Sequence, residues 1–295
     1  MKKTIFFSLM AAALAASCNK PVQMDMDTDL RIEVSTVPTK SIIETQKLPS
    51  GSEIGLFLAE KDKATYDDLS YANVKYTASG EDASQVWNPE RSVYLSTTNG
   101  TVSAYFPYSS TVTDITAIPV ETASQTDYMW ATQKDNVNNT SATVPLTMNH
   151  ALAAVRVTIK KGTYTGPAEV TDLYVQSDGL TDTAILDATD GTLSGFGLSQ
   201  GISPESEQFT ITATPTEKTI LVIPNNQSQA ICIKLNIDGK PFEAETTAMQ
   251  LTAGTITIFN LTLNSEIMTL DGVSVTPWGE TDKGSLDLEI DPERI

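Results

Sequence analysis

Apolar and polar residues alternate at every second position in several stretches spread along this chain. The alternation is clearest in Leu30–Val37, in Val155–Ile159 and in Ile231–Ile237. One side of such a segment faces a core and the other faces water, which is the pattern of a half-buried antiparallel strand. Helical periodicity is scarce. The sequence therefore predicts an all-β protein.

Further apolar runs predict more strands, and turn residues separate them. The additional strands are expected at Ile54–Leu58, Val102–Tyr108, Leu173–Val175, Phe209–Ala213, Ile220–Ile223 and Thr255–Leu263. In the last run the apolar phase changes between Ile258 and Phe259, which predicts a β-bulge there. Asn99-Gly100 and Asp238-Gly239 are expected to form tight turns. Many short strands with frequent turns indicate β-sandwiches, and a chain of 295 residues has room for two.

The polar stretch Lys134–Thr143 is the expected boundary between these two sandwiches. We therefore expect an N-terminal β-sandwich over residues 30–143 and a C-terminal one over residues 144–278. Residues 279–295 then form a C-terminal tail.

The first residues have the pattern of an export signal. Met1-Lys2-Lys3 is followed by an apolar run that is too short to span a membrane. Ala15-Ala16-Ser17 precede Cys18, as in the bacterial lipobox, although Leu14 lies one position earlier than usual. We expect residues 1–17 to be a signal peptide, Cys18 to carry lipid that anchors the chain at a membrane, and residues 18–29 to be a tether. An ordinary signal peptide with an incidental cysteine is the alternative.

The charge excludes one class of partner. Removal of residues 1–17 takes two of the 19 basic residues, so 17 remain against 37 acidic ones, a net charge of −20. Such a chain repels phosphate backbones, and nucleic-acid binding is not expected. Cys232 is then the one cysteine besides the expected anchor, so no disulfide framework is predicted.

Catalytic motifs are not found in the sequence. His150 is the single histidine, and a lone histidine at a strand end is more often a structural hydrogen-bonding group than a base. The sequence contains no zinc-ligand set, nucleophile elbow or phosphate-binding glycine loop. The acidic pairs Asp178 with Asp182 and Asp187 with Asp190 lack EF-hand spacing. Neither an enzyme, a metal nor a cofactor is expected; an enzyme using scattered carboxylates would instead need a deep acidic cleft.

Six motifs occur in order along the chain. They are VWNPERSVYLS (86–96), VSAYFPYSS (102–110), DYMWATQ (127–133), VPLTMNHALAAVRVTI (144–159), LTAGTITIFNLTL (251–263) and VSVTPWG (273–279). Together with the lipobox, this set resembles the fimbrillin-like (Mfa-like) family of bacterial lipoproteins that build type V pili. The resemblance implies two tandem transthyretin-like β-sandwich domains, a location at the outer membrane or cell surface of a Gram-negative bacterium, and other pilus subunits as partners.

The resemblance also implies how such a chain would be processed. In this family a protease specific for Arg or Lys removes an N-terminal strand, and an extended segment of another subunit fills the vacated groove. Lys40 follows the first predicted strand in an exposed, turn-like stretch, so it is the first candidate for cleavage. Arg31 lies within that strand and ranks second. Lys40 could equally be an ordinary surface lysine.

The C-terminal tail contains a candidate for the donated segment. Leu286, Leu288 and Ile290 lie at every second position in GSLDLEI, so their side chains are expected on one side of a strand. This pattern fits insertion into a neighbour's groove. It fits equally a last strand packed on its own domain.

A different function class is a monomeric surface lipoprotein that binds a glycan or another host or bacterial surface ligand. That alternative predicts an exposed aromatic patch around Trp87, Trp130 or neighbouring tyrosines, and no polymerisation.

Overall fold

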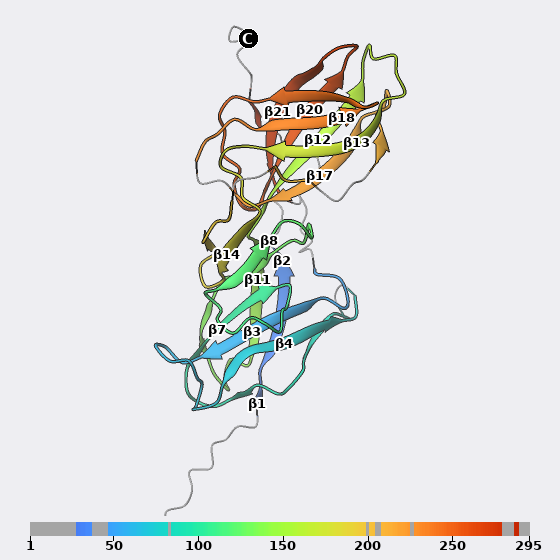
Figure 1. The fold of residues 1–295 in the computed structure, drawn as a ribbon. Helices are drawn as coiled ribbons and strands as arrows, with labels where there is room; N and C mark the ends of the chain where they lie inside the picture. Colours follow the sequence, from blue (N-terminus) through green and yellow to red (C-terminus); the bar gives the residue numbers. More distant parts are fainter. Residues whose placement is uncertain are drawn as a thin grey trace, which may run out of the picture.

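The computed structural model describes residues 28–36, 47–81, 84–198, 201–203, 208–224 and 227–278, and the backbone of 286–288. Within these ranges the secondary structure is β with no α-helix, and no helix long and apolar enough to cross a membrane is found there. The predicted all-β class is confirmed. The molecule is elongated, with two lobes of strands joined through a narrower middle (Figure 1).

The first lobe is built around one strongly curved sheet. Its strands are β2 (Arg31–Thr36), β3 (Glu53–Ala59), β4 (Tyr71–Ser79), β5 (Val86–Pro89), β7 (Gly100–Phe106), β9 (Met129–Ala131), β10 (Lys134–Val137) and β11 (Thr143–His150). Their order is β2-β11-β9-β7-β3-β4-β5, with β10 also paired to β7. The terminal strands β2 and β5 contact each other, so the sheet wraps around its own core. A short ribbon of β1 (Thr28–Asp29) and β6 (Tyr94–Leu95) lies beside it.

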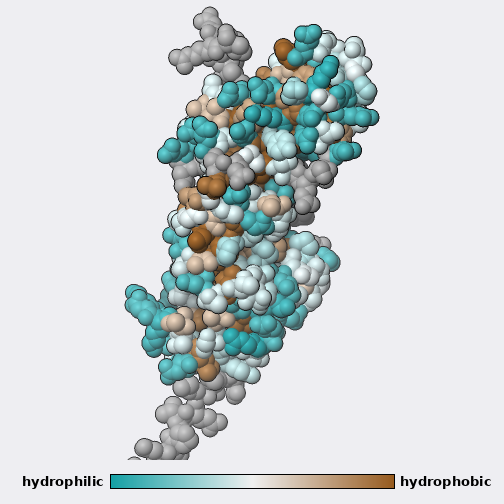
Figure 2. All heavy atoms as spheres, viewed as in Figure 1, coloured by the Kyte–Doolittle hydropathy of each residue, from teal (hydrophilic) through white to brown (hydrophobic). Residues whose placement is uncertain are grey.

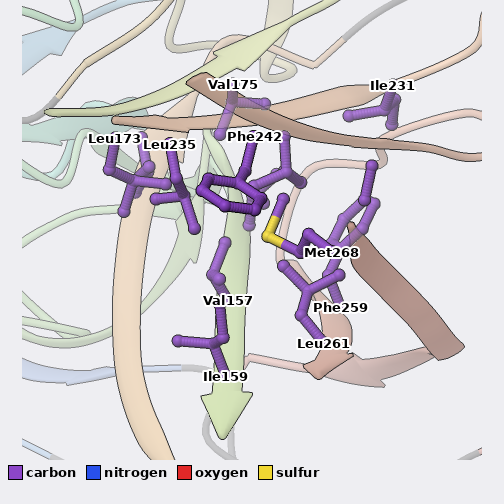
Figure 3. Packing of buried hydrophobic residues seen from close by; sticks show 14 of the residues in the cluster. Val157, Ile159, Leu173, Val175, Ile231, Leu235, Phe242, Phe259, Leu261 and Met268 are labelled. Atoms are coloured by element: carbon purple, nitrogen blue, oxygen red, sulfur yellow. The ribbon is translucent and has the colours of Figure 1, made fainter. Parts of the chain in front are cut away.

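The second lobe is a sandwich of two sheets. One has the order β17-β12-β20-β21-β22, and the other has the order β16-β13-β18-β19. The first comprises β17 (Thr216–Val222), β12 (Ala153–Lys161), β20 (Thr255–Leu263), β21 (Met268–Pro277) and β22 (Leu286–Leu288). The second comprises β16 (Phe209–Thr210), β13 (Glu169–Gln176), β18 (Cys232–Ile237) and β19 (Lys240–Glu245). Apolar side chains of both sheets point toward one another and form one core (Figure 3).

A third, smaller sheet lies between the lobes. Its strands are β8 (Ile118–Glu121), β14 (Thr183–Asp187) and β15 (Thr192–Ser194). β8 precedes β11 in the chain and β14 follows β12, so this sheet joins segments from both lobes. Its buried residues form a separate cluster with residues of both large sheets, including Tyr105, Leu152 and Ile258. We call this cluster the junction core.

The change from the first lobe to the second comes after the stretch expected as a domain boundary. Lys134–Thr143 contains β10 and the first residue of β11, and both strands belong to the first sheet. Val144, Leu146 and Met148 are buried in the core of the first lobe. The chain enters the second sandwich after β11, at Ala151 and Leu152. Lys134–Thr143 therefore contains β10 and its connection to β11, and both strands belong to one sheet.

Strand β20 contains an irregularity, but not where the sequence predicted a bulge. The phase change between Ile258 and Phe259 arises because both faces of β20 are covered: Ile258 joins the junction core and Phe259 the core of the second sandwich. The register shift lies further along, between Asn260 and Leu261, and leaves Asp271 of β21 without a pairing partner. The bulge predicted between Ile258 and Phe259 was therefore wrong in position.

Candidate functional site

Strand β2 and the residue before it fill a slot in the first lobe. Leu30, Ile32, Val34 and Thr36 are 2%, 6%, 4% and 6% exposed. The intervening Arg31 and Glu33 are exposed. Side chains therefore enter the core at every second position, as the alternation predicted. We call the space that these four buried side chains fill in the core of the first lobe the β2 slot.

The backbone of β2 is held along one edge. It runs parallel to β11, from Arg31 opposite Thr143 to Thr36 opposite Met148. At its start, the N–H of Leu30 donates to the carbonyl of Val93 at 2.8 Å, and the N–H of Arg31 donates to the carbonyl of Ala142 at 2.8 Å. β2 is the terminal strand of its sheet. Its removal would leave the edge of β11 without a partner.

Aromatic side chains close the slot from the direction of β4 and β5. The hydroxyl of Tyr76 lies 3.4 Å from the carbonyl oxygen of Leu30 and donates to it. Burial raises the pKa of Tyr76 well above its usual value, and the nearby Asp29 and Tyr71 add to this effect. Trp87 on β5 is 7% exposed and belongs to the same core. These side chains form the wall opposite β11, and the sequence alone did not indicate that they serve β2.

The predicted processing residues differ in their position. Arg31 is exposed, but its N–H is bonded to Ala142 and it begins the ladder with β11. A protease acting there would need the start of β2 to detach. Lys40 and the expected lipid-bearing Cys18 lie outside the described residues.

The predicted donor segment contains a strand of its own sheet. β22 pairs antiparallel with β21, with Leu286 opposite Val275 and Leu288 opposite Val273. This arrangement is the alternative left open by the sequence pattern, a last strand on its own domain. Ile290 lies outside the described residues. β1 and β2 belong to one lobe, whereas β21 and β22 belong to the other (Figure 1).

A cluster of His150, Asp127 and Trp278 lies where the chain leaves β21. Nδ1 of His150 is 2.8 Å from Oδ2 of Asp127, and the imidazole ring stacks on Trp278 with 4.4 Å between centroids and 10° between planes. The three residues come from β11, the segment before β9, and the end of β21. The structure therefore gives His150 the hydrogen-bonding and packing contacts expected of a structural residue.

Trp87 and Trp130 do not form the exposed aromatic patch that the ligand-binding alternative predicted around them. Trp87 is buried in the first lobe, Trp130 packs beside the junction core, and Trp278 stacks on His150. All three contribute to packing because large rings bury more apolar surface than other side chains. Figure 2 shows a mostly hydrophilic visible face with separate apolar patches.

The acidic residues do not gather into a metal site in the part of the chain that the structure describes. No group of three or more His, Cys, Asp or Glu side chains there is placed to hold a metal ion. Asp187 and Asp190 instead accept hydrogen bonds within their own turn, from the N–H groups of Thr189 and Thr192.

Comparison with known families adds to this geometry. The profile of the fimbrillin-like family matches residues 39–278. The chain belongs to the fimbrillin-like family. The matched range covers most of both lobes; it begins after β2 and ends before β22. No curated protein sequence matches this fimbrillin-like chain.

Several solved structures share the fold of this fimbrillin-like protein. A candidate cell adhesion protein from Bacteroides uniformis is 17% identical with a TM-score of 0.67, covering 85% of this chain and 98% of that one. A second, from Bacteroides ovatus, is 18% identical with a TM-score of 0.64, covering 86% and 99%. A fimbrial protein from Bacteroides vulgatus is 15% identical with a TM-score of 0.50, covering 85% and 100%. The alignments extend over both lobes, so the two-lobed arrangement is common to these proteins.

Proposed function

We propose that this chain is a structural and adhesive subunit of a bacterial surface pilus, with other pilus subunits as its partners. The observation that carries the proposal is β2, a terminal strand with four alternating side chains in an apolar slot and a backbone ladder on one edge. Membership of the fimbrillin-like family supports it. The names of the structural relatives, fimbrial or candidate cell adhesion proteins, agree with this role.

The proposed assembly proceeds by proteolysis and strand exchange. The precursor is exported as a lipoprotein anchored through Cys18 in the outer membrane, and cleavage at Lys40 releases the tether together with β2. The edge of β11 at Thr143–Met148 is then unpaired, and the β2 slot is empty. An unpaired edge beside empty apolar pockets binds an extended segment readily, because both backbone hydrogen bonds and side-chain burial are regained.

The C-terminal segment of another copy has the pattern that this slot requires. Leu286, Leu288 and Ile290 recur at the spacing of Leu30, Ile32 and Val34. In this proposal β22 first leaves β21 and then lies along β11 of the next subunit. No enzymatic activity is proposed for the chain.

The test uses soluble protein that begins at Asn19, so that lipid plays no part. It is treated with an Arg/Lys-specific protease and run unboiled on a denaturing gel, beside a version truncated after Gly279. We expect a ladder of polymers from the first and monomer from the second. Lys40→Gln should delay or abolish the ladder, whereas Lys61→Gln, at an exposed position away from β2, should not.

A clean monomer after complete release of residues 19–40 would contradict self-polymerisation. A ladder that persists in the version truncated after Gly279 would contradict the assignment of Leu286, Leu288 and Ile290 to the donor segment.

A further inference from the structure

A groove of about 1000 Å³ lies on the first lobe, away from the β2 slot. Its floor is formed by residues of β3, β7 and β10, with Gln133 beside them, and its two walls are formed by the segments 60–64 and 113–115. β3 and β7 are neighbours in the middle of the first sheet (Figure 1). The groove lies on the outer face of this sheet, whereas the buried side chains of β2, the terminal strand of the same sheet, point toward its inner face.

Alternation along β3 and β7 explains why this face is only partly covered. Leu56 and Leu58 point into the core of the first lobe, so Phe57 and Ala59 point outward. Tyr105 of β7 also points outward, but it is fully buried in the junction core. Phe57 packs on the edge of that core and remains partly exposed. The junction core covers one part of the outer face of β3 and β7, and the groove lies over the part that it leaves uncovered.

The loop that forms the first wall is held in place by hydrogen bonds. Tyr66 donates through its hydroxyl to the carbonyl of Thr98 at 2.7 Å and accepts from the N–H of Ser96 at 3.1 Å. Nζ of Lys63 donates to Glu60 at 2.7 Å. The contacts of Tyr66 fix the loop between β3 and β4 to the segment before β7, and the Lys63–Glu60 ion pair lies within that loop.

The loop that forms the second wall is also anchored. Nδ2 of Asn73 donates to the carbonyls of Ser109 and Val112, each at 2.8 Å. The N–H of Thr116 donates to Oδ1 of Asp114 at 2.9 Å. Both walls are thus formed before any ligand arrives, which lowers the entropic cost of binding.

The lining is acidic and rich in hydrogen-bonding groups. It contains the carboxylates of Glu60, Asp62, Asp114 and Asp135 and the ammonium groups of Lys61 and Lys63. Four negative and two positive charges disfavour anionic ligands. On the floor, Thr101 donates to Oδ1 of Asp135 at 2.6 Å, and Gln133 donates to Ser103 at 2.8 Å. The second oxygen of the Asp135 carboxylate can accept further hydrogen bonds.

We propose that this groove binds a neutral oligosaccharide. Carboxylates and amides suit sugar hydroxyl groups, which donate and accept hydrogen bonds without carrying charge. Phe57 supplies an apolar surface for one face of a sugar ring, and the small side chains of Ala59 and Ser103 leave room beside it. The inference does not depend on strand exchange, since the groove lies on the outer face of the sheet and no residue of β2 lines it.

The test is calorimetric titration of the unprocessed soluble protein from Asn19. The neutral probes are cellotetraose, maltotetraose, mannotetraose and chitotetraose, with tetragalacturonate as the acidic probe and tetralysine as the basic one. We expect at least one neutral sugar to bind and tetragalacturonate not to bind. Asp135→Ala should weaken that binding about tenfold, because it removes a charged acceptor from the floor.

Asp271→Ala is the matched control. Asp271 accepts the hydroxyl of Thr262 at 2.5 Å on an exposed surface of the second lobe, as Asp135 accepts that of Thr101. Its substitution should leave the affinity unchanged. The proposal is overturned if no neutral probe binds at about 10 mM, if Asp135→Ala and Asp271→Ala behave alike, or if tetralysine alone binds. Each result is obtained with unpolymerised protein, so it is independent of the gel assay for assembly.

Discussion

The side-chain amide of Gln125 pairs with both backbone groups of Leu221. Its Nε2 donates to the carbonyl of Leu221 at 3.2 Å, and the N–H of Leu221 donates to its Oε1 at 2.8 Å. Gln125 belongs to the segment between β8 and β9, whereas Leu221 lies on β17, the terminal strand of a sheet in the second lobe. The Gln125 side chain therefore satisfies the backbone N–H and C=O of Leu221 as a neighbouring strand would. It connects the two lobes beside the junction core.

Gln125→Ala should loosen this tie. The substitution removes both hydrogen bonds and leaves the buried Leu221 with an unpaired N–H, which costs about 1–3 kcal/mol of unfolding free energy. Urea unfolding followed by tryptophan fluorescence measures the change. Gln133→Ala, at an exposed glutamine whose side chain donates to the hydroxyl of Ser103, should cost less than about 1 kcal/mol. Equal stabilities of the two variants would contradict the prediction.

Gly191→Ala should destabilise the junction through Trp130. Gly191 has φ +81°, and a Cβ built there would lie 2.3 Å from the indole ring of Trp130. The backbone strain costs about 1 kcal/mol, and displacement of a packed ring adds about 1–3 kcal/mol. Thermal unfolding should therefore show a marked fall in the melting temperature.

Gly239→Ala separates these two effects. Gly239 has a similar φ of +75°, but a Cβ there would meet nothing within 4 Å. This variant should show only the backbone cost, so it should be clearly more stable than Gly191→Ala. Equal melting temperatures for the two variants would contradict a destabilising contact with Trp130.

Asp238 should contribute to stability in a pH-dependent way. Desolvation acts to raise the pKa of this carboxyl, but hydrogen bonds from the N–H of Glu169, the hydroxyl of Tyr164 and the N–H of Ala168, with nearby Lys161, outweigh it and lower the pKa. A pKa depressed in the folded state means that this stability is present above the unfolded value of about 4 and is lost as the pH falls through the folded value.

Asp238→Asn removes that dependence. We expect the stability of the variant to vary less with pH below about 4 than that of the natural chain. Tyr164→Phe, which removes one of the three donors, should give an intermediate slope. Urea midpoints measured between neutral and acidic pH test both variants, and parallel pH profiles for all three proteins would contradict the assignment.

A charge in the β2 slot should detach the strand. Val34→Lys places an ammonium group at a buried position in the β2 slot, which lowers the unfolding free energy by about 3 kcal/mol or more. Hydrogen exchange at the amides of 143, 144 and 146–148 should then accelerate, because β11 loses its parallel neighbour. Glu33→Lys, at the adjacent exposed position, should leave exchange at β11 unchanged. Fast exchange in both variants would contradict the slot geometry.

Much of the fold could be predicted from local pattern, because a strand with one buried face has a period of two. Leu30–Val37 and Thr255–Leu263 match β2 and β20 closely for this reason. The same pattern does not say which sheet a strand joins. β11 and β12 both alternate and are nearly continuous in sequence, yet they belong to different lobes, and the expected boundary preceded both.

The candidate site was less predictable, since its parts are distant in sequence. Alternation indicated that Leu30, Ile32 and Val34 face a core, but it could not show that β11 would be their parallel partner. The wall formed by Tyr76 and Trp87 also depends on how the sheet curves. The contact of His150 with Trp278 joins residues far apart in the chain, and a local sequence pattern gives no signal for such a pair.

The separation of β2 and β22 into different lobes determines the symmetry that strand exchange could produce. The slot of one copy would meet the C-terminal segment of the next, so the two joined surfaces are unlike and no twofold axis relates them. Each added subunit would fill one slot and carry an empty slot of its own. A ring closes only if the rotation between successive copies allows it. Growth by this contact gives a polar filament whose two ends differ, and its length depends on the supply of processed chains.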